Sequence, residues 1–259
     1  MSTHRKPIAI LMYHQIDVAP PKGSALRGLV VAPGTFFMHM AVMWLLGYRG
    51  LSMSELEPYL TGKKSGKVFG ITFDDGYLNN LRNALPVLQR FGFSSTCYVV
   101  ADLLGKTNVW DAKNGIAQVP LMTAADLCEW IAGGQDVGSH TLTHSRLTSL
   151  DGEALYQEVA GSRASLESAL ATSGGVRHFC YPYGAYNGSS VQAAADAGYT
   201  TATTTQRGRV HVGGQLDLLQ LPRVLVSRTT TWVHLLLKCF TRYEDKRSAE
   251  NALYDNARV

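Results

Sequence analysis

Residues 71–77, Ile-Thr-Phe-Asp-Asp-Gly-Tyr, place two adjacent carboxylates directly after an apolar run that begins at Val68. A short apolar run of this kind is typical of a buried strand. Carboxylates so close together raise one another's pKa unless a cation intervenes, so Asp74 and Asp75 are candidates for a functional site. The alternative is a pair of solvated turn residues, which is the usual interpretation of an isolated Asp-Asp-Gly.

The whole chain alternates short apolar runs with segments of helical period, which is the pattern of a parallel α/β sheet. The predicted strands are Ile8–Tyr13, Val68–Phe73, Ser95–Val100, Asp136–Ser139, His178–Tyr181, Thr200–Thr203 and Val224–Val226. The predicted helices are Phe36–Leu46, Glu55–Tyr59, Leu78–Phe91, Ala124–Ala132, Gly152–Ala171, Ser189–Ala197 and Thr231–Phe240. About seven such units favour a (β/α) barrel, with a flat doubly wound sheet as the alternative.

Several polar residues fall at or just after predicted strand ends, where parallel α/β folds build their sites. These residues are His14, Asp74, Asp75, His140 and Tyr183. We therefore expect them to converge, with the two long loops 23–34 and 105–120 forming part of the same site.

The composition is that of a globular protein, with 46% apolar and 17% charged residues. No linker or low-complexity segment divides the chain, which predicts one domain over residues 1–259 with a core at about 7–240. The formal net charge of +4 comes from scattered Lys and Arg, which argues against a nucleic-acid partner.

The sequence features that bear on location predict a cytoplasmic protein. The first apolar run is too short for a signal peptide, and the longest, Phe36–Leu46, falls short of the roughly 20 residues that span a bilayer. The four cysteines form no C-x-x-C pair, which is typical of reduced core thiols.

The segment Ser139-His140-Thr141-Leu142-Thr143-His144 contains two histidines four residues apart. On a helical turn this spacing places both imidazoles on one face, within reach of one metal ion. An isolated pair of this kind is more often made of surface or capping histidines. Together with Asp75, however, His140 and His144 form a two-His, one-carboxylate set, which is how catalytic Zn²⁺ and related divalent ions are held.

A third segment, Phe179-Cys180-Tyr181-Pro182-Tyr183-Gly184, predicts an aromatic turn stiffened by proline after another strand. It could be a tight loop that packs its rings inward. Alternatively, it forms a pocket wall in which Tyr181, Pro182 and Tyr183 offer flat surfaces to a sugar and a backbone N–H binds an oxyanion.

The ordered motifs T-F-D-D-G, S-H-T-L-T-H and Y-P-Y-G resemble those of the polysaccharide deacetylase family with NodB homology, carbohydrate esterase family 4. The opening I-L-M-Y-H and the later L-P-R segment resemble the branch that includes poly-N-acetylglucosamine deacetylases. The resemblance spans Pro7 to Phe240. It implies a distorted (β/α)7 barrel and metal-dependent de-N-acetylation of a glycan.

The resemblance also implies roles for the motif residues. Asp74 matches the catalytic base, while Asp75, His140 and His144 match the ligands of one divalent metal. Zn²⁺ is the expected ion, with Co²⁺ or Mn²⁺ as alternatives. Hydrolysis would use metal-activated water, and the metal together with a backbone N–H of Tyr183 would stabilise the oxyanion.

The chain departs from the family pattern at two places. Cys180 stands where many members have an arginine that orients the catalytic aspartate, and Arg223 of L-P-R is the candidate substitute, against a surface or strand-capping role. The usual Leu-x-His near the C-terminus has no clear match. We interpret His14 as that general acid, moved to the front by a circular permutation of the barrel. His234 is the alternative, although its apolar helical context is typical of a core histidine.

These observations predict removal of N-acetyl groups from N-acetylhexosamine residues of a bacterial polysaccharide or a lipid-linked oligosaccharide. The second substrate fits a cytoplasmic protein, and the apolar, partly basic segment Trp232 to Arg247 would then contact the inner membrane surface. Two alternatives stay open: hydrolysis of another amide or imide, and a non-catalytic glycan-binding module.

Overall fold

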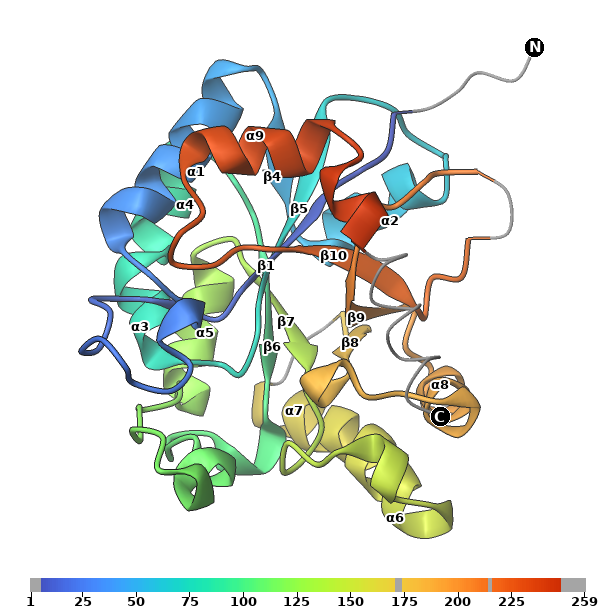
Figure 1. The fold of residues 1–259 in the computed structure, drawn as a ribbon. Helices are drawn as coiled ribbons and strands as arrows, with labels where there is room; N and C mark the ends of the chain where they lie inside the picture. The colour runs from blue at the N-terminus through green and yellow to red at the C-terminus, as the bar shows by residue number, and fades with distance from the viewer. Residues whose placement is uncertain (1–5, 171–173, 214–215, 248–259) are drawn as a thin grey trace.

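The computed structural model describes residues 6–170, 174–213 and 216–247. Its main sheet is a ring of parallel strands that follow one another in chain order (Figure 1). The ring consists of β1 (Ile10–Tyr13), β5 (Val68–Phe73), β6 (Thr96–Val99), β7 (Asp136–Ser139), β8 (His178–Cys180), β9 (Thr201–Arg207) and β10 (Leu221–Leu225). Because β1 pairs with both β10 and β5, the sheet closes on itself. The barrel prediction is confirmed, and the flat sheet is wrong.

The barrel is distorted beside β5. Strand β4 (Arg49–Leu51) pairs with the beginning of β5, whereas β6 pairs only with its end, at Thr72 and Phe73. β4 therefore takes the place that β6 would fill in a regular barrel. The sequence did not predict β4, nor the short pair β2 (Gln15–Ile16) and β3 (Val30–Val31), because two or three residues show no period.

Helices surround the strands (Figure 1). They are α1 (Pro33–Leu45), α2 (Met53–Leu60), α3 (Leu78–Asn83), α4 (Leu85–Phe91), α5 (Ala124–Ala132), α6 (Gly152–Tyr156), α7 (Ser162–Leu170), α8 (Gly188–Asp196) and α9 (Trp232–Phe240). The single helix predicted over 78–91 is wrong, since it breaks at Ala84, where Pro86 in the next turn cannot continue the hydrogen bonding. A π-helical turn at Gln157–Gly161 interrupts the helix predicted over 152–171, and Ala171 lies outside the described residues.

Two further expectations concern membrane spans and cysteines. Within the described part of the chain, no helix has both the length and the apolar character needed to cross a bilayer. All four cysteines are free thiols, and three of them are buried, as predicted for reduced core residues. All barrel strands belong to one sheet, which supports the proposal of a single domain with a core at about 7–240.

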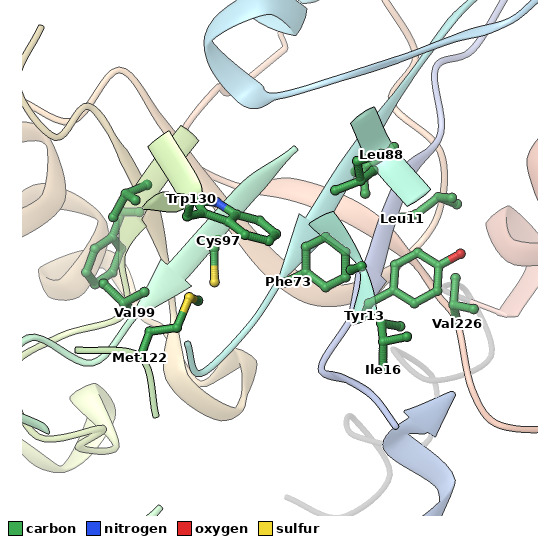
Figure 2. Packing of buried hydrophobic residues seen from close by; sticks show 14 of the residues in the cluster. Leu11, Tyr13, Ile16, Phe73, Leu88, Cys97, Val99, Met122, Trp130 and Val226 are labelled. Carbon is green, nitrogen blue, oxygen red and sulfur yellow. The ribbon is translucent and has the colours of Figure 1, made fainter. Parts of the chain in front are cut away.

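The core between barrel and helices is built on stacked rings (Figure 2). Tyr13 of β1 stacks on Phe73 of β5 at 5.6 Å between ring centres, and Trp130 of α5 meets Phe73 edge-on at 5.7 Å. Side chains alternate along a strand. Because Phe73 packs outward against the helices, its neighbours Thr72 and Asp74 point into the barrel.

His39 of α1 is fully buried and joins three parts of the fold. Its Nδ1 accepts from the hydroxyl of Tyr13 at 3.0 Å, and its Nε2–H donates to the carbonyl of Thr230 at 2.9 Å. Burial lowers the pKa of His39 to about 4, although the bond to Thr230 opposes this shift. The imidazole is therefore neutral at neutral pH, which both hydrogen bonds require.

We expect His39 to make the protein less stable in mild acid. Below about pH 6.5 the unfolded chain binds a proton that the native His39 does not, so the free energy of unfolding falls as pH drops toward 4. Between pH 7.5 and 5.0 this single group lowers it by about 2 kcal/mol. Urea unfolding at the two pH values measures the difference. His39→Gln should be less stable at pH 7.5 but lose this part of the pH dependence; an identical dependence in both proteins would contradict the assignment.

Candidate active site

The motif residues meet in a cavity of about 410 Å³ at the carboxyl ends of the barrel strands. Each strand except β6 contributes its last residues or the turn that follows it, as expected for a parallel barrel, and β6 contributes through the long loop after it. The lining includes Met12, His14, Asp74, Asp75, His140, His144, Tyr181, Tyr183, Thr205 and Leu225. Of the candidates proposed from the sequence, Arg223 lies beneath this cavity, and Pro182 and His234 do not line it.

The turn after β5 separates the two adjacent carboxylates. Asp75 and Gly76 both have left-handed backbone conformations, with φ of 74° and 79°. Aspartate tolerates this region better than most residues. At Gly76 a Cβ atom would lie 3.0 Å from a methyl group of Val99, so the tight turn also needs glycine. The turn sends Asp75 to different partners from those of Asp74.

Asp75 faces two imidazoles. Its Oδ1 lies 3.4 Å from Nε2 of His140 and 3.3 Å from Nε2 of His144, and all three residues are buried. The other ring nitrogen of His140, Nδ1, donates to the carbonyl of Cys180 at 2.7 Å. This bond directs the lone pair of Nε2 toward Asp75, which is the usual orientation of a metal-binding histidine. The donor set therefore fits a divalent ion.

The two histidines do not lie on a helix, so the helical-turn interpretation of their spacing is wrong. Residues 140–144 form a loop in which Thr141 and His144 have φ of 70° and 64°. The hydroxyl of Thr141 accepts from the N–H of His144, and Glu158 accepts from the N–H groups of residues 142 and 143. These bonds bring both rings to one point without helical geometry.

The charges of this group are coupled. Burial alone would raise the pKa of Asp75, but the bonds to His140 and His144 hold it well below its usual range. Burial lowers the pKa of His144, whereas the neighbouring Cys180 and the bond to Asp75 raise the pKa of His140 despite its burial. A divalent ion would bind both histidines as neutral imidazoles.

Asp74 is held by Arg223 of β10. The guanidinium donates to both carboxylate oxygens, at 2.6 and 2.7 Å, and both side chains are almost completely buried. Arg223 also donates to the carbonyl of Thr204 and the hydroxyl of Thr72. The alternative of a surface or strand-capping arginine is therefore wrong. Burial alone would raise the pKa of Asp74, but Arg223 holds it below its usual value.

The small side chain of Cys180 leaves space for Arg223 beside Asp74. Its Sγ lies 3.2 Å from Nη2 of Arg223, so a small side chain on β8 leaves room for a guanidinium from β10. Asp74, His140 and Cys180 are also close enough together to be considered as metal ligands. Both oxygens of Asp74 are already paired with the guanidinium of Arg223. The set of Asp75, His140 and His144 is therefore the better candidate to bind a metal ion.

The two candidate acids lie in different places. Nε2 of His14 is 3.9 Å from Oδ2 of Asp74, at the edge of the cavity. His234 is exposed in the first turn of α9. The prediction of a core histidine there is wrong, because Leu235 and Cys239 carry the buried face of this helix.

The third motif contributes chiefly through Tyr183. Its backbone is left-handed, with φ of 58°, and its ring lies edge-on to His144 at 4.6 Å. Tyr181 also lines the cavity, but it is buried and its hydroxyl donates to the carbonyl of Leu219. Pro182 is buried.

Trp110 and Asp111, from the long loop 105–120, were not predicted individually. Trp110 stacks on His144 with 4.4 Å between ring centres, and both residues line the cavity. Burial raises the pKa of Asp111, and the charge of Asp75 adds to this shift. The only signal was the length of the loop, since a Trp-Asp pair within it follows no spacing rule.

Comparison with known proteins supports one family. The polysaccharide deacetylase family model matches residues 61–202. YxkH of Bacillus subtilis strain 168, whose name places it among polysaccharide deacetylases, is 30% identical over 203 residues, or 78% of this chain. The chain spans 65% of the length of that relative.

Solved structures show the same fold. The deacetylase PplD of Streptococcus pyogenes, in complex with acetate, superposes with a TM-score of 0.78 at 27% identity, covering 91% of this chain and 99% of that one. IcaB of Ammonifex degensii superposes with a TM-score of 0.73 at 25% identity, covering 90% and 97%.

The buried pair of Asp74 and Arg223 predicts a large loss of stability when only the cation is removed. Arg223→Met should lower the free energy of unfolding by about 3–5 kcal/mol, because it leaves a buried carboxylate without a partner. Urea unfolding near neutral pH measures this. The double variant with Asp74→Asn should recover part of the loss, and a double variant no more stable than Arg223→Met would show that the charge pair is not its cause.

Proposed function

Because the chain belongs to the polysaccharide deacetylase family, we propose that it hydrolyses the acetamide group of an N-acetylhexosamine residue in a bacterial glycan, with one divalent ion as cofactor. The main observation in support of this proposal is that two adjacent carboxylates have different partners. Asp75 faces two imidazoles and Asp74 faces a guanidinium, within one cavity. The structure of PplD with acetate supports acetyl as the group removed.

Asp75, His140 and His144 would hold the ion. Zn²⁺ suits two imidazoles and a carboxylate, and Co²⁺ or Mn²⁺ are the alternatives. When bound, such an ion supplies Lewis acidity, which polarises a carbonyl and eases the loss of a proton from water. The stacked ring of Trp110 and the carbonyl of Cys180 hold the two imidazoles in place.

Asp74 is the proposed base. Arg223 fixes both of its oxygens and keeps it ionised at neutral pH, so it can accept a proton from the attacking water. Arg223 itself is a positioning residue, because it is fully buried beneath the cavity. The backbone N–H of Tyr183 is the proposed oxyanion donor, a contribution of about 3 kcal/mol in comparable sites.

His14 is the proposed acid. Its Nε2 faces Asp74 at 3.9 Å, and on approach to hydrogen-bond distance it would receive the proton taken from water and pass it to the leaving amine. Its strand, β1, stands in the ring between β10 and β5. A residue from the first strand can therefore take the place of one that normally follows the last strand, as the proposed circular permutation requires.

Acetate release from N-acetylglucosamine oligomers is the direct test. We expect no release from the metal-stripped protein and recovery with Zn²⁺, Co²⁺ or Mn²⁺. Asp74→Asn should lower turnover by about 10²–10⁴-fold, as expected for loss of a general base, while the bound metal measured by mass spectrometry stays unchanged. Release that needs no metal, or an Asp74→Asn variant with full activity, would overturn the mechanism. Activity on small amides but not on these sugars would favour another amide hydrolase.

We further propose peripheral contact with a membrane surface through α9, which would accompany the predicted cytoplasmic location. Trp232 and Val233 are 46% and 53% exposed at its beginning, and aromatic residues favour membrane interfaces. Lys238 does not add free charge there, since it is largely buried and pairs with Glu244 at 2.7 Å.

The double variant Trp232→Ser, Val233→Ser should reduce co-sedimentation with phosphatidylglycerol liposomes several-fold. Val109→Ser is the matched control, because Val109 is 48% exposed on a different element, and it should sediment like the unchanged protein. Equal sedimentation of all three proteins would end the membrane proposal without affecting that of deacetylation.

A further inference from the structure

A second cavity, of about 350 Å³, adjoins the active-site cavity. It lies between the segment 15–30 and the loop 115–119, and the two cavities share Leu26 and Ile116 as lining residues. Figure 1 shows both segments, in dark blue and green, on the same side of the molecule. We call this second cavity the side groove.

The side groove is lined mainly by apolar side chains. Besides the shared residues, these are Val18, Pro20, Pro21, Ala25, Val30, Ala117 and Val119. Its polar side chains are those of Gln15, Asp17, Ser24 and Tyr77. Gln15 and Asp17 both accept hydrogen bonds from Asn79, and the second oxygen of Asp17 accepts from a backbone N–H. Because Gln15 and Asp17 are already bonded and most of the remaining lining is apolar, the groove suits an aliphatic group better than the hydroxyls of a second sugar.

The residues that the two cavities share lie at the mouth of the active site rather than at its floor. Asp74 and Asp75, which the acetamide must reach, are 2% and 7% exposed, whereas the shared Leu26 is 44% exposed. Leu26 also has a left-handed backbone, with φ of 56°, which is rare for this residue type. A substrate group that extends out through this mouth is therefore the aglycone joined to the sugar. It is not the acyl group that is being removed.

The charged residues around the two cavities further limit the kind of group that can bind in the side groove. Among the described residues that line the two cavities, none is a lysine or an arginine, while Asp17 and Asp111 contribute carboxyl groups. A phosphate or diphosphate between sugar and chain would find no lysine or arginine partner in this lining. An uncharged glycosidic linkage meets no such penalty.

We propose that the side groove binds a neutral aliphatic aglycone, so that the preferred substrates are glycolipids whose N-acetylhexosamine is joined to its chain without phosphate. The inference rests on the proposed function for the identity of the sugar. The groove itself is defined by its own lining. Its occupant enters past Leu26 and Ile116 while the acetamide stays at Asp74 and Asp75.

The test compares two ligands that differ only in the aglycone: the heptyl and methyl β-glycosides of N-acetylglucosamine. Each methylene withdrawn from water is worth about fourfold in affinity, so burial of even two methylenes should lower the Kd of the heptyl glycoside by more than tenfold. Titration calorimetry on the full chain measures both. This binding comparison does not depend on turnover, so a failure of acetate release would overturn the proposed function and leave the groove to be judged on affinity.

Ala117→Glu should abolish the heptyl advantage, because Ala117 is exposed and lines only the side groove. Ala112→Glu is the matched control: it is also exposed on this loop but lines neither cavity, and it should keep the advantage. Both variants should bind the methyl glycoside like the unchanged protein. Equal Kd values for the two glycosides, or a heptyl advantage that survives Ala117→Glu, would overturn the proposal.

Two further ligands test whether the side groove binds an acyl chain or a second sugar instead of an aliphatic aglycone. A methyl glycoside with an N-octanoyl group in place of acetyl should gain no affinity; if it gains more than the heptyl glycoside, the groove holds acyl chains instead. The N-acetylglucosamine disaccharide should also bind more weakly than the heptyl glycoside. Tighter binding of the disaccharide would identify the groove as a sugar subsite and refute the aliphatic assignment.

Discussion

The ion pair between Asp74 and Arg223 is the constraint on which this structure depends. A carboxylate inside a barrel is costly unless a cation compensates it, and here the cation comes from β10, 149 positions away in the chain. The pair exists only if β10 closes the ring against β1 and so lies near β5. The ionised state of Asp74 therefore depends on closure of the ring of strands.

The same turn produces a second, different environment one residue later. Left-handed backbone at Asp75 directs it to two imidazoles rather than to the guanidinium. Neighbouring carboxylates would otherwise suppress each other's ionisation. Giving each its own positively charged or proton-bearing partner keeps both ionised within one cavity, which is the arrangement that a metal ligand and an adjacent base need.

The sequence predicted the parts that local pattern encodes. The barrel strands, most helices and the convergence of His14, Asp74 and His140 at strand ends followed from periodicity and from the parallel topology. Features that depend on contacts between distant segments did not follow. Arg223 was equally compatible with the surface, because only the closed ring brings it to Asp74, and the stacking of Trp110 on His144 depends on a loop without a repeating pattern.

The contact between Cys180 and Arg223 limits which side chains these two positions can carry together. Side chains from several strands point into the same interior of a barrel. A cation that is needed at one place there can therefore come from more than one strand. Once β10 supplies it, an arginine at position 180 would place a second guanidinium against the first. The two positions are therefore coupled in this barrel: an arginine at position 180 would be compatible with the fold only if residue 223 no longer placed its guanidinium there.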